Sequence, residues 1–293
     1  MRERILITGA SGQLGNAVLN EFQEYEILAV DLIHPEIQSQ SIEFKSLDIT
    51  KKDEVKSVIQ SFKPEIILNL AAMTDVDSCE ENPALAEEIN SNCLNSFLDE
   101  FQGTFVQIST DYVFNGEAGP YDETDQTDPI NNYGRTKLNS EKLVRAYSNQ
   151  WVILRTNVVY DYIQSTKASF VKWVVDSLSN GKSINVVNDQ WNNPTWTVSL
   201  AKILHQALNK NMTGLFHFGG ADQVNRYQFA GMIAEVFNLD NSLINPISTS
   251  ELKQIAPRPL NCGLKTQLIE SKLGVKPISL LECLTKIKSK LTA

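Results

Sequence analysis

Near its N-terminus the chain reads Ile5-Leu6-Ile7-Thr8-Gly9-Ala10-Ser11-Gly12-Gln13-Leu14-Gly15, an apolar run followed by glycines spaced Gly-x-x-Gly-x-x-Gly. Glycines at these positions allow a tight turn and a close approach of the backbone to a ligand. In a helix that follows such a turn, the first free N–H groups and the positive end of the dipole face a bound pyrophosphate. The stretch predicts a strand, a phosphate-binding loop and a helix. A glycine loop that merely joins a strand to a helix would show the same pattern.

The alternation of short apolar runs and helical patterns continues through the first half of the chain. Six segments have the composition of strands: Ile5–Thr8, Glu26–Asp31, Ile42–Lys45, Glu65–Leu70, Phe105–Ser109 and Trp151–Arg155. Four segments carry apolar residues at helical spacing: Asn16–Gln23, Asp53–Phe62, Pro83–Phe101 and Tyr133–Tyr147. Continuously apolar strands that alternate with helices indicate a parallel sheet covered on both faces. We therefore expect a Rossmann-type, doubly wound α/β fold with right-handed crossovers.

After Arg155 strand-like and helix-like segments no longer alternate regularly. We expect helices at Ser169–Leu178, Val198–Asn209 and Arg226–Phe237, a strand at Leu215–Phe218, and a polar lid or pocket wall at Asn188–Thr197. The predicted division assigns 1–160 mainly to a dinucleotide-binding domain, with 198–218 rejoining its sheet. Residues 161–197 and 219–293 then form a smaller C-terminal substrate-binding region.

Composition excludes several classes of function. The chain has 293 residues, and 26 Lys and Arg against 35 Asp and Glu give a net charge of −9, which argues against nonspecific nucleic-acid binding. No apolar stretch approaches the roughly 18 residues that span a bilayer, so we expect no membrane association. No export signal is visible, and we expect a cytoplasmic protein. The four cysteines form no Cys-x-x-Cys pair and the three histidines are scattered, so no metal site is expected.

Two aspartates follow predicted strands of the first half. Asp31 closes the second strand, where a carboxylate would accept hydrogen bonds from an adenosine ribose and would repel a 2′-phosphate. An ordinary solvated Asp at a strand end would look the same. Asp48 and Ile49 follow the third strand and are candidates for contact with the adenine edge.

A tyrosine and a lysine stand four residues apart at Tyr133 and Lys137, and hence on one face of the predicted helix. Free tyrosine titrates near pH 10, and a nearby cation favours the phenolate. The pair can therefore serve proton transfer to or from a ligand. Because such pairs also arise by chance, the position of this one after the fifth strand is what makes it informative.

The fifth strand ends in Ser109 and Thr110, which places two hydroxyls at the carboxyl edge of the sheet. Open α/β sheets bind their ligands at this edge. Thr110 could donate a hydrogen bond to a substrate carbonyl, or both hydroxyls could cap the strand end.

The glycine loop, the strand-end hydroxyl and the Tyr/Lys pair stand in the order that a nicotinamide-dependent carbonyl reductase needs. The chain resembles the extended short-chain dehydrogenase/reductase superfamily and, within it, the dTDP-4-dehydrorhamnose reductase family. The more specific matches are Asn69–Asp77, Ser109–Phe114, Leu154–Thr156, Asp189–Gln190, Pro194–Thr195 and Arg258–Asn261. Several of them lie outside the predicted cofactor domain, so the resemblance extends over nearly the whole chain.

The resemblance implies a role for each matching residue. Tyr133 would protonate the sugar O4, Lys137 would lower the pKa of Tyr133 and bind the nicotinamide ribose, and Thr110 would orient the carbonyl. NADPH or NADH would be the cofactor. The implied cofactor-binding residues are Gly9, Ser11, Gly12, Gln13, Leu14, Gly15, Asp31, Asp48, Ile49, Ala71, Ala72, Met73, Tyr133 and Lys137. The implied substrate-binding residues are Thr74, Val76, Thr110, Asp111, Val158 and Arg258.

The implied reaction is reduction of a nucleotide-linked 4-keto-6-deoxy sugar, dTDP-4-dehydro-L-rhamnose to dTDP-L-rhamnose, in the synthesis of cell-surface polysaccharide precursors. A nucleotide sugar would be the substrate, and a homodimer is a candidate assembly. The chain departs from the family at Asn157-Val158, where an aromatic residue is common, so the hexose stays open. Two alternatives remain: a non-catalytic dinucleotide-binding regulatory subunit, and a related nucleotide-sugar epimerase or 6-deoxy-talose-forming reductase.

Overall fold

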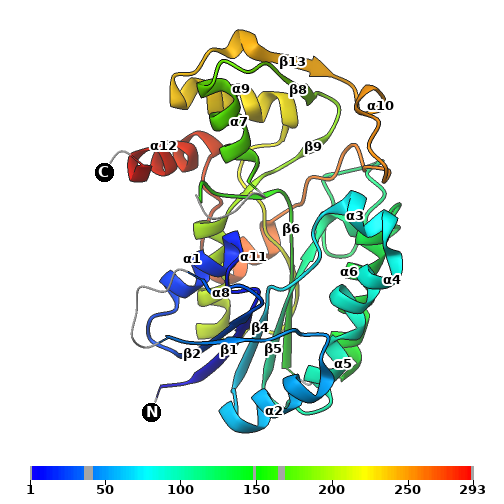
Figure 1. The fold of residues 1–293 in the computed structure, drawn as a ribbon, viewed down its shortest axis with the longest axis vertical. Coiled ribbons are helices and arrows are strands. Elements are labelled where there is room, and N and C mark those ends of the chain that lie inside the picture. The colour runs from blue at the N-terminus through cyan, green and yellow to red at the C-terminus, as the bar shows by residue number, and fades with distance from the viewer. Residues whose placement is uncertain (1, 36–41, 148–149, 164–168, 292–293) are drawn as a thin grey trace.

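The computed structural model describes residues 2–35, 42–147, 150–163 and 169–291 (Figure 1). Seven parallel strands form its central sheet in the order β11-β6-β5-β4-β1-β2-β3. The strands are β1 (Arg4–Thr8), β2 (Glu26–Asp31), β3 (Ile42–Ser46), β4 (Ile66–Asn69), β5 (Thr104–Thr110), β6 (Gln150–Thr156) and β11 (Gly214–His217). This arrangement confirms the predicted doubly wound sheet. Its strand order reverses between β1 and β4, the point at which such folds bind ligands.

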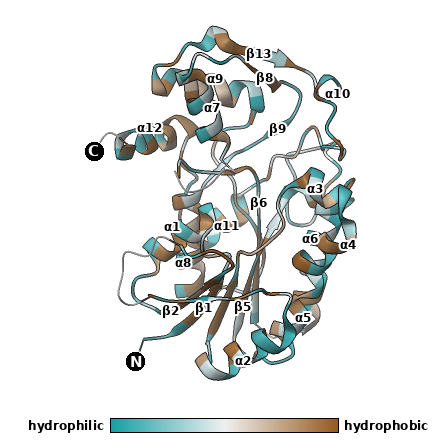
Figure 2. Ribbon diagram, viewed as in Figure 1, coloured by the Kyte–Doolittle hydropathy of each residue, from teal (hydrophilic) through white to brown (hydrophobic). Residues whose placement is uncertain are grey.

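Helices cover both faces of the sheet, because successive side chains of each strand point to opposite sides. On one face Ile5 and Ile7 pack against α1 (Gln13–Glu21) and α8 (Thr197–Asn209). On the other face Leu6 packs into a core that includes residues of α2 (Lys52–Phe62), α5 (Leu94–Leu98) and α6 (Asn132–Tyr147). Figure 2 shows the resulting hydrophobic strands between more mixed helices. The expected two-sided burial is therefore present.

The segment Pro83–Phe101 is not the single helix that its apolar spacing predicts. It consists of α4 (Pro83–Glu87), a π-helical turn (Glu88–Asn92) and α5, which ends at Leu98. The N–H of Cys93 donates to the carbonyl of Glu88 at 3.0 Å, the five-residue spacing of a π turn. The turn carries Asn90, whose buried side chain makes its hydrogen bonds outside this helix. The predicted single helix is therefore two short helices joined by a π-helical turn.

A second cluster of elements lies beyond the carboxyl ends of the sheet strands (Figure 1). Its core brings together α7 (Phe170–Ser179), α9 (Arg226–Phe237), α12 (Leu280–Leu291) and the parallel pair β8 (Ile184–Val187) and β13 (Ile244–Ile247). The remaining elements are α3 (Val76–Glu81), η2 (Asp111–Val113), β7 (Val159–Tyr160), β9 (Trp191–Asn192), β10 (Thr195–Trp196), β12 (Val224–Asn225), η3 (Asn241–Leu243), α10 (Thr249–Leu252) and α11 (Gln267–Leu273).

The C-terminal half does not separate cleanly from the sheet. β11 pairs with β6 in parallel, as expected for a strand near Leu215–Phe218. Ile269 and Leu273 of α11 also pack into the core of the sheet layer, although sequence analysis assigned 219–293 to the substrate region. The proposed division into two functional parts stays a prediction. No helix in the described ranges combines the length and the apolar composition that crossing a bilayer requires.

The segment Asn188–Thr197, predicted as a lid or pocket wall, is tied into the fold by short strands. β9 pairs antiparallel with β12, and β10 pairs parallel with β7. The buried amide of Asn193 donates to the carbonyls of Gly220 and Leu264 at 3.1 and 3.0 Å and accepts from Asn157 at 2.7 Å. The segment packs against Asn157 and is not among the residues that line the main cavity described below.

Candidate active site

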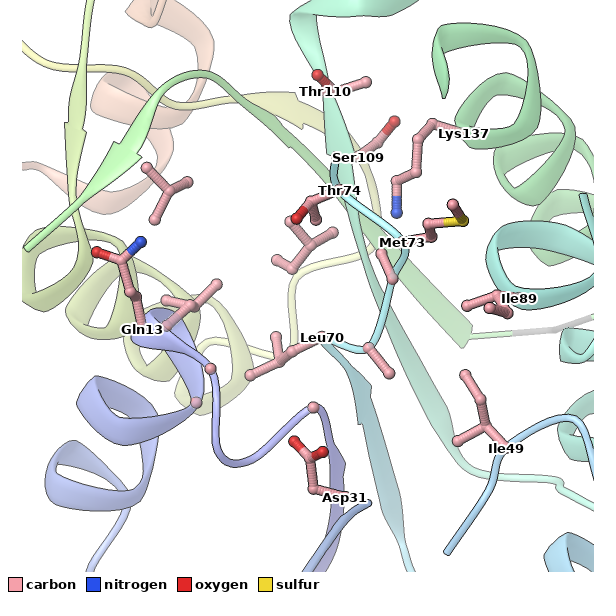
Figure 3. Close-up of a pocket in the computed structure, with 18 of the residues that line it drawn as sticks. Gln13, Asp31, Ile49, Leu70, Met73, Thr74, Ile89, Ser109, Thr110 and Lys137 are labelled. Carbon is pink, nitrogen blue, oxygen red and sulfur yellow. The ribbon is translucent and has the colours of Figure 1, made fainter. Parts of the chain in front are cut away.

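A cavity of about 620 Å³ opens at the carboxyl ends of the central strands (Figure 3). Most of the residues singled out in the sequence line it: Gly9, Gly12, Gln13, Leu14, Gly15, Asp31, Asp48, Ile49, Ala71, Ala72, Met73, Thr74, Thr110, Tyr133, Lys137 and Val158. Four others, Ser11, Val76, Asp111 and Arg258, do not form part of its wall. The fold thus brings the glycine loop and the Tyr/Lys pair, more than a hundred residues apart, to one cavity.

The glycine loop is shaped for close backbone approach. Gly9 has φ +66°, and a Cβ there would lie 2.6 Å from the backbone N of Ala71. A Cβ at Gly15 would lie 2.4 Å from the carbonyl oxygen of Ala10. Gly12, at the N-cap of α1, has no side chain to cap the helix. The start of α1 therefore presents backbone N–H groups and its positive dipole end to the cavity, and this fits a pyrophosphate.

We expect Gly15→Ala to lower the free energy of unfolding by about 1–3 kcal/mol, because its methyl group would meet backbone atoms that cannot move independently. Gly231→Ala is the matched control. Gly231 also lies within a helix, and the first atom a Cβ would meet there is 3.7 Å away. The control should leave stability unchanged or raise it by up to about 1 kcal/mol. Urea unfolding of both variants measures the difference, and equal stabilities would contradict the close packing at Gly15.

Asp31 holds the glycine loop. Its Oδ2 accepts the N–H of Ser11 at 2.9 Å, and its Oδ1 accepts the N–H of Leu32 at 2.7 Å. The backbone of Ser11 is therefore anchored to Asp31, although Ser11 itself does not line the cavity. Asp48 lies at the same end and accepts the N–H and hydroxyl of Thr50. The hydrogen bond from the Thr50 hydroxyl and, to a smaller extent, the one from the Thr50 N–H lower the pKa of Asp48.

Two buried polar networks fix the segment after β4 that carries Ala71, Ala72 and Met73. The hydroxyl of Thr8 donates to Asn69 Oδ1 at 2.6 Å and accepts the N–H of Ala71 at 3.1 Å. Asn90 accepts the N–H of Met73 at 2.7 Å and donates to the Met73 carbonyl and the Thr136 hydroxyl. Thr136 lies between Tyr133 and Lys137 on α6, so Asn90 connects the segment after β4 to the helix that carries Tyr133 and Lys137. Sequence analysis missed Asn90, because a single Asn in a helical pattern carries no signal of its own.

Helix α6 places Tyr133 and Lys137 one turn apart beside the end of β5, where Thr110 lies. Figure 3 shows the Lys137 ammonium directed into the cavity toward the segment of Met73 and Thr74. Burial lowers the pKa of Lys137 to about 8. Burial raises the pKa of Tyr133, and hydrogen bonding to Thr110 acts in the opposite direction. The effect of Lys137 on this pKa, which the resemblance implies, stays a prediction.

Behind Lys137 lies a buried ion pair. Glu141, on the next turn of α6, accepts Arg155 Nε at 2.8 Å, Arg155 Nη2 at 2.7 Å and the Ser109 hydroxyl at 2.6 Å. The negative charge of Glu141 favours the charged form of Lys137 and partly offsets the effect of burial. Ser109 lines the cavity together with Thr110, but its hydroxyl is bonded to this network.

Asp111, implied to face the sugar, is buried behind Thr110. Its Oδ1 accepts the Thr110 hydroxyl at 3.1 Å, whereas its Oδ2 is buried without a hydrogen-bond partner. Burial raises the pKa of Asp111 from its ordinary 3.8 to about 7, and the positive charge of Arg226 partly opposes that rise. Sequence analysis did not foresee Arg226, whose guanidinium interacts with Asp111 and Tyr112.

This shift predicts a pH-dependent stability. Because the pKa of Asp111 is higher in the folded than in the unfolded state, its contribution is complete below pH about 4 and is lost as the pH rises through about 7. Between about pH 5.5 and pH 8.5 the free energy of unfolding should fall by about 2 kcal/mol more in the natural protein than in Asp111→Asn. Urea unfolding at both pH values measures this, and parallel changes in the two proteins would contradict it.

Of the other residues implied to contact the substrate, Val158 lines the cavity, whereas Val76 and Arg258 do not. The guanidinium of Arg258 is paired with Asp77 at 2.9 Å and donates to the Ala256 carbonyl at 3.2 Å. Val76 begins α3 and does not reach the cavity wall. Val158 lines the cavity with φ +40°, a conformation that is unfavourable for a β-branched residue. Its carbonyl accepts the N–H of Thr195 at 3.2 Å, which helps to hold it.

Comparison with known proteins agrees with this geometry. A family model described as the RmlD substrate binding domain matches residues 2–292. The chain belongs to this family. Its similarity to dTDP-4-dehydrorhamnose reductase from Aggregatibacter actinomycetemcomitans is 33% identity over 304 aligned residues, 98% of this chain and 98% of the relative. The resemblance inferred from the sequence motifs is confirmed.

Two further relatives bear on function. The structure of dTDP-4-dehydrorhamnose reductase from Bacillus anthracis str. Ames in complex with NADP is similar with a TM-score of 0.90 and 30% identity, covering 99% of this chain and 100% of that one. Methionine adenosyltransferase 2 subunit beta from Bos taurus is 34% identical over 281 residues, 93% of this chain and 83% of the relative. The chain is thus similar both to proteins named as reductases and to one named as a subunit of another enzyme.

Proposed function

We propose that the chain is an NAD(P)H-dependent oxidoreductase that reduces a nucleotide-linked 4-keto-6-deoxy sugar, specifically dTDP-4-dehydro-L-rhamnose to dTDP-L-rhamnose. The observation that carries the proposal is the meeting of Thr110, Tyr133 and Lys137 at one cavity, with the glycine loop at its other end. The similarity to dTDP-4-dehydrorhamnose reductases along nearly the whole chain supports the choice of substrate. The product would be a precursor of cell-surface polysaccharide.

The cofactor-binding residues fit a dinucleotide. Backbone N–H groups at the start of α1 suit the pyrophosphate, Asp31 lies where an adenosine ribose would be, and Ala71 to Met73 form a wall along the cavity. When bound, the nicotinamide supplies the hydride that the carbonyl carbon of the sugar receives.

Three side chains of the protein would take part in the transfer of a proton to the sugar. On substrate binding the Thr110 hydroxyl would turn from Asp111 Oδ1 to the carbonyl oxygen, and Tyr133 would transfer its proton to that oxygen as negative charge develops there. Because burial raises the pKa of Tyr133, the phenol carries its proton at neutral pH, and a cation nearby would make it a stronger acid when it donates. Lys137 binds the ribose hydroxyls, and its charge stabilises the phenolate that remains. Thr74 and Val158 line the cavity near these groups and would contact the sugar.

A coupled assay tests the proposal. The protein is mixed with NADH or NADPH and with dTDP-4-dehydro-L-rhamnose generated in place, and both the absorbance of the reduced nicotinamide and the sugar product are followed. We expect oxidation of the cofactor with formation of dTDP-L-rhamnose. Formation of the 6-deoxy-talose isomer would identify the related reductase instead. A change of configuration without net oxidation would identify an epimerase.

A second candidate is a dinucleotide-binding subunit without turnover, favoured by the 34% identity to methionine adenosyltransferase 2 subunit beta. Under this candidate the protein would copurify with a catalytic partner and would leave the keto sugar unreduced. The complete set of Thr110, Tyr133 and Lys137 at the cavity favours the reductase. The homodimer and the cytoplasmic location stay predictions; light scattering of the purified protein tests the first.

A further inference from the structure

We propose that Asp111 is a positioning residue of the reduction. In its protonated form the carboxyl group donates to Thr110, and this leaves the hydroxyls of Thr110 and Tyr133 free to turn toward the keto sugar. The proposal rests on the reductase function proposed above and adds to it a residue that acts through Thr110. Asp111 lies behind the cavity wall and would not contact the sugar itself, in contrast to what the family resemblance implies.

The Thr110 hydroxyl, which faces the cavity, already uses its full hydrogen-bonding capacity. It donates to Asp111 Oδ1 at 3.1 Å and accepts the N–H of Tyr112 at 3.2 Å. It also forms a hydrogen bond with the Tyr133 hydroxyl. A hydroxyl offers one proton and two lone pairs. Since the proton of Thr110 goes to Asp111, Tyr133 donates to the remaining lone pair, and neither hydroxyl proton is available to a ligand.

The charge of Asp111 decides the direction of these hydrogen bonds. An ionised carboxylate only accepts hydrogen bonds, so the Thr110 proton faces Asp111 as long as Asp111 is ionised. A protonated carboxyl group can instead donate to Thr110 Oγ1, and together with the N–H of Tyr112 it then occupies both lone pairs. The Thr110 proton is released and Tyr133 loses its acceptor. Both protons can then turn toward a carbonyl oxygen in the cavity, where negative charge develops during reduction.

An ionised Asp111 would hold Thr110 firmly. Asp111 is 2% exposed, and its Oδ2 has no hydrogen-bond partner among the described residues. Of the interactions that favour the ionised form, the hydrogen bond with Thr110 is the largest. Turning Thr110 toward a substrate would take this bond away from a buried charge, which is costly. A protonated Asp111 carries no charge and keeps its hydrogen bond, so the cost does not arise.

The other titratable groups around Asp111 keep their charge near neutral pH. Helix α9 contributes the Arg226 guanidinium, whose positive charge favours ionised Asp111 less strongly than burial opposes it. Burial raises the pKa of Tyr112 in η2 and of Tyr133 in α6, so both phenols stay neutral. The Cys262 thiol donates to the main-chain carbonyl of Asp111 at 3.5 Å, and burial raises its pKa as well. Asp111, with a pKa of about 7, is therefore the group of this cluster that changes charge.

The pH profile of the reduction tests the proposal. Single-turnover rates of the natural protein and of Asp111→Asn are measured between pH 6 and pH 8.5, with reduced dinucleotide and dTDP-4-dehydro-L-rhamnose both bound. Asparagine cannot ionise, and its Nδ2 can donate to Thr110 as the protonated acid does. Over this range the rate should fall about tenfold to thirtyfold more in the natural protein than in Asp111→Asn, as for the loss of one proton near pH 7. Equal falls would overturn the proposal, because any effect of Lys137 is common to both proteins.

Asp240→Asn is the matched control. Asp240 is exposed, and its hydrogen bond with the Ser242 hydroxyl, 2.7 Å long, lowers its pKa, so it stays ionised over the whole range. The pH profile of this variant should follow that of the natural protein. Dinucleotide binding at the same pH values separates positioning from a loss of folded structure. We expect the dissociation constant of the natural protein to change much less than its rate, and a parallel loss of binding and rate would contradict the proposal.

Should Asp111→Asn fail to fold, two changes at Thr110 provide the test. Thr110→Val keeps the shape and lacks the hydroxyl, so the rate should fall by about 10²- to 10³-fold, and the remaining rate should no longer fall near pH 7. Thr110→Ser keeps the hydroxyl and should keep the fall near pH 7. A fall that persists in Thr110→Val would refute action through Thr110.

The outcomes separate this role from the function on which it rests. If the natural protein reduces the keto sugar and all variants share its pH profile, the role of Asp111 is refuted and the reductase function stands. If the natural protein leaves the keto sugar unreduced at every pH, both are refuted.

Discussion

Replacing Tyr133 by Phe should lower the rate of keto-sugar reduction by about 10²- to 10⁴-fold, the usual contribution of a positioned proton donor. Phenylalanine preserves the ring and its edge-on contact with Tyr112, with centroids 5.9 Å apart, and removes only the hydroxyl. Binding of the reduced dinucleotide should change little, because the glycine loop and Lys137 are intact. The measurement is the single-turnover rate with cofactor and keto sugar both bound.

The matched control for this variant is Tyr25→Phe. Tyr25 stands just before β2, away from the cavity, and its hydroxyl donates to Asn209 at 3.3 Å. Loss of that hydrogen bond should affect stability by about 1 kcal/mol and leave the reduction rate unchanged. A Tyr133→Phe protein that reduces the sugar at the natural rate would place the proton donor elsewhere.

Replacing Glu141 by Gln should lower the free energy of unfolding by about 3–5 kcal/mol, the usual effect of removing one partner of a buried ion pair. The side chains of Glu141 and Arg155 are 1% and 3% exposed, so the guanidinium left behind could not be solvated. His217, whose Nε2 lies 3.4 Å from Arg155 Nη1, cannot compensate for the lost carboxylate, because an imidazole carries no negative charge. Urea unfolding near neutral pH measures the loss.

Glu282→Gln provides the comparison for this change. Glu282 pairs with Lys286 at 2.7 Å on the surface of α12, and both side chains are about half exposed. Such a pair contributes at most about 1 kcal/mol. If Glu141→Gln were no more destabilising than Glu282→Gln, the network behind Lys137 would not have the structural role assigned to it.

The sheet could be predicted from the sequence because its central strands are buried on both faces. The central strands read as continuous apolar runs, as in Ile66–Leu68, whereas the edge strand β3 alternates and is largely exposed. The π turn at Glu88–Asn92 could not be predicted, since it depends on tertiary hydrogen bonds of Asn90. The short strands β9 and β10 were also missed, because two-residue strands leave no periodic pattern.

The site was predictable to the extent that its residues lie in local patterns. The glycine loop and the pair Tyr133 and Lys137 have characteristic spacings, and their convergence follows from the parallel topology. Other contacts of the site join residues from different elements. Glu141 pairs with Arg155, Arg226 interacts with Asp111, and Arg258 pairs with Asp77. Side-chain contacts of this kind depend on packing that no spacing rule records. The burial of Tyr133, which raises its pKa, likewise does not follow from the spacing of Tyr133 and Lys137.

The most direct test of the central claim is the fate of the hydride. NADH or NADPH carrying deuterium at the transferable position of C4 is mixed with the protein and dTDP-4-dehydro-L-rhamnose, and the sugar is analysed by mass spectrometry and NMR. We predict one deuterium at C4 of dTDP-L-rhamnose for each cofactor oxidised, and its loss in Tyr133→Phe. A keto sugar recovered unlabelled and unreduced, with the dinucleotide bound and still reduced, would contradict the assignment of this chain as a reductase.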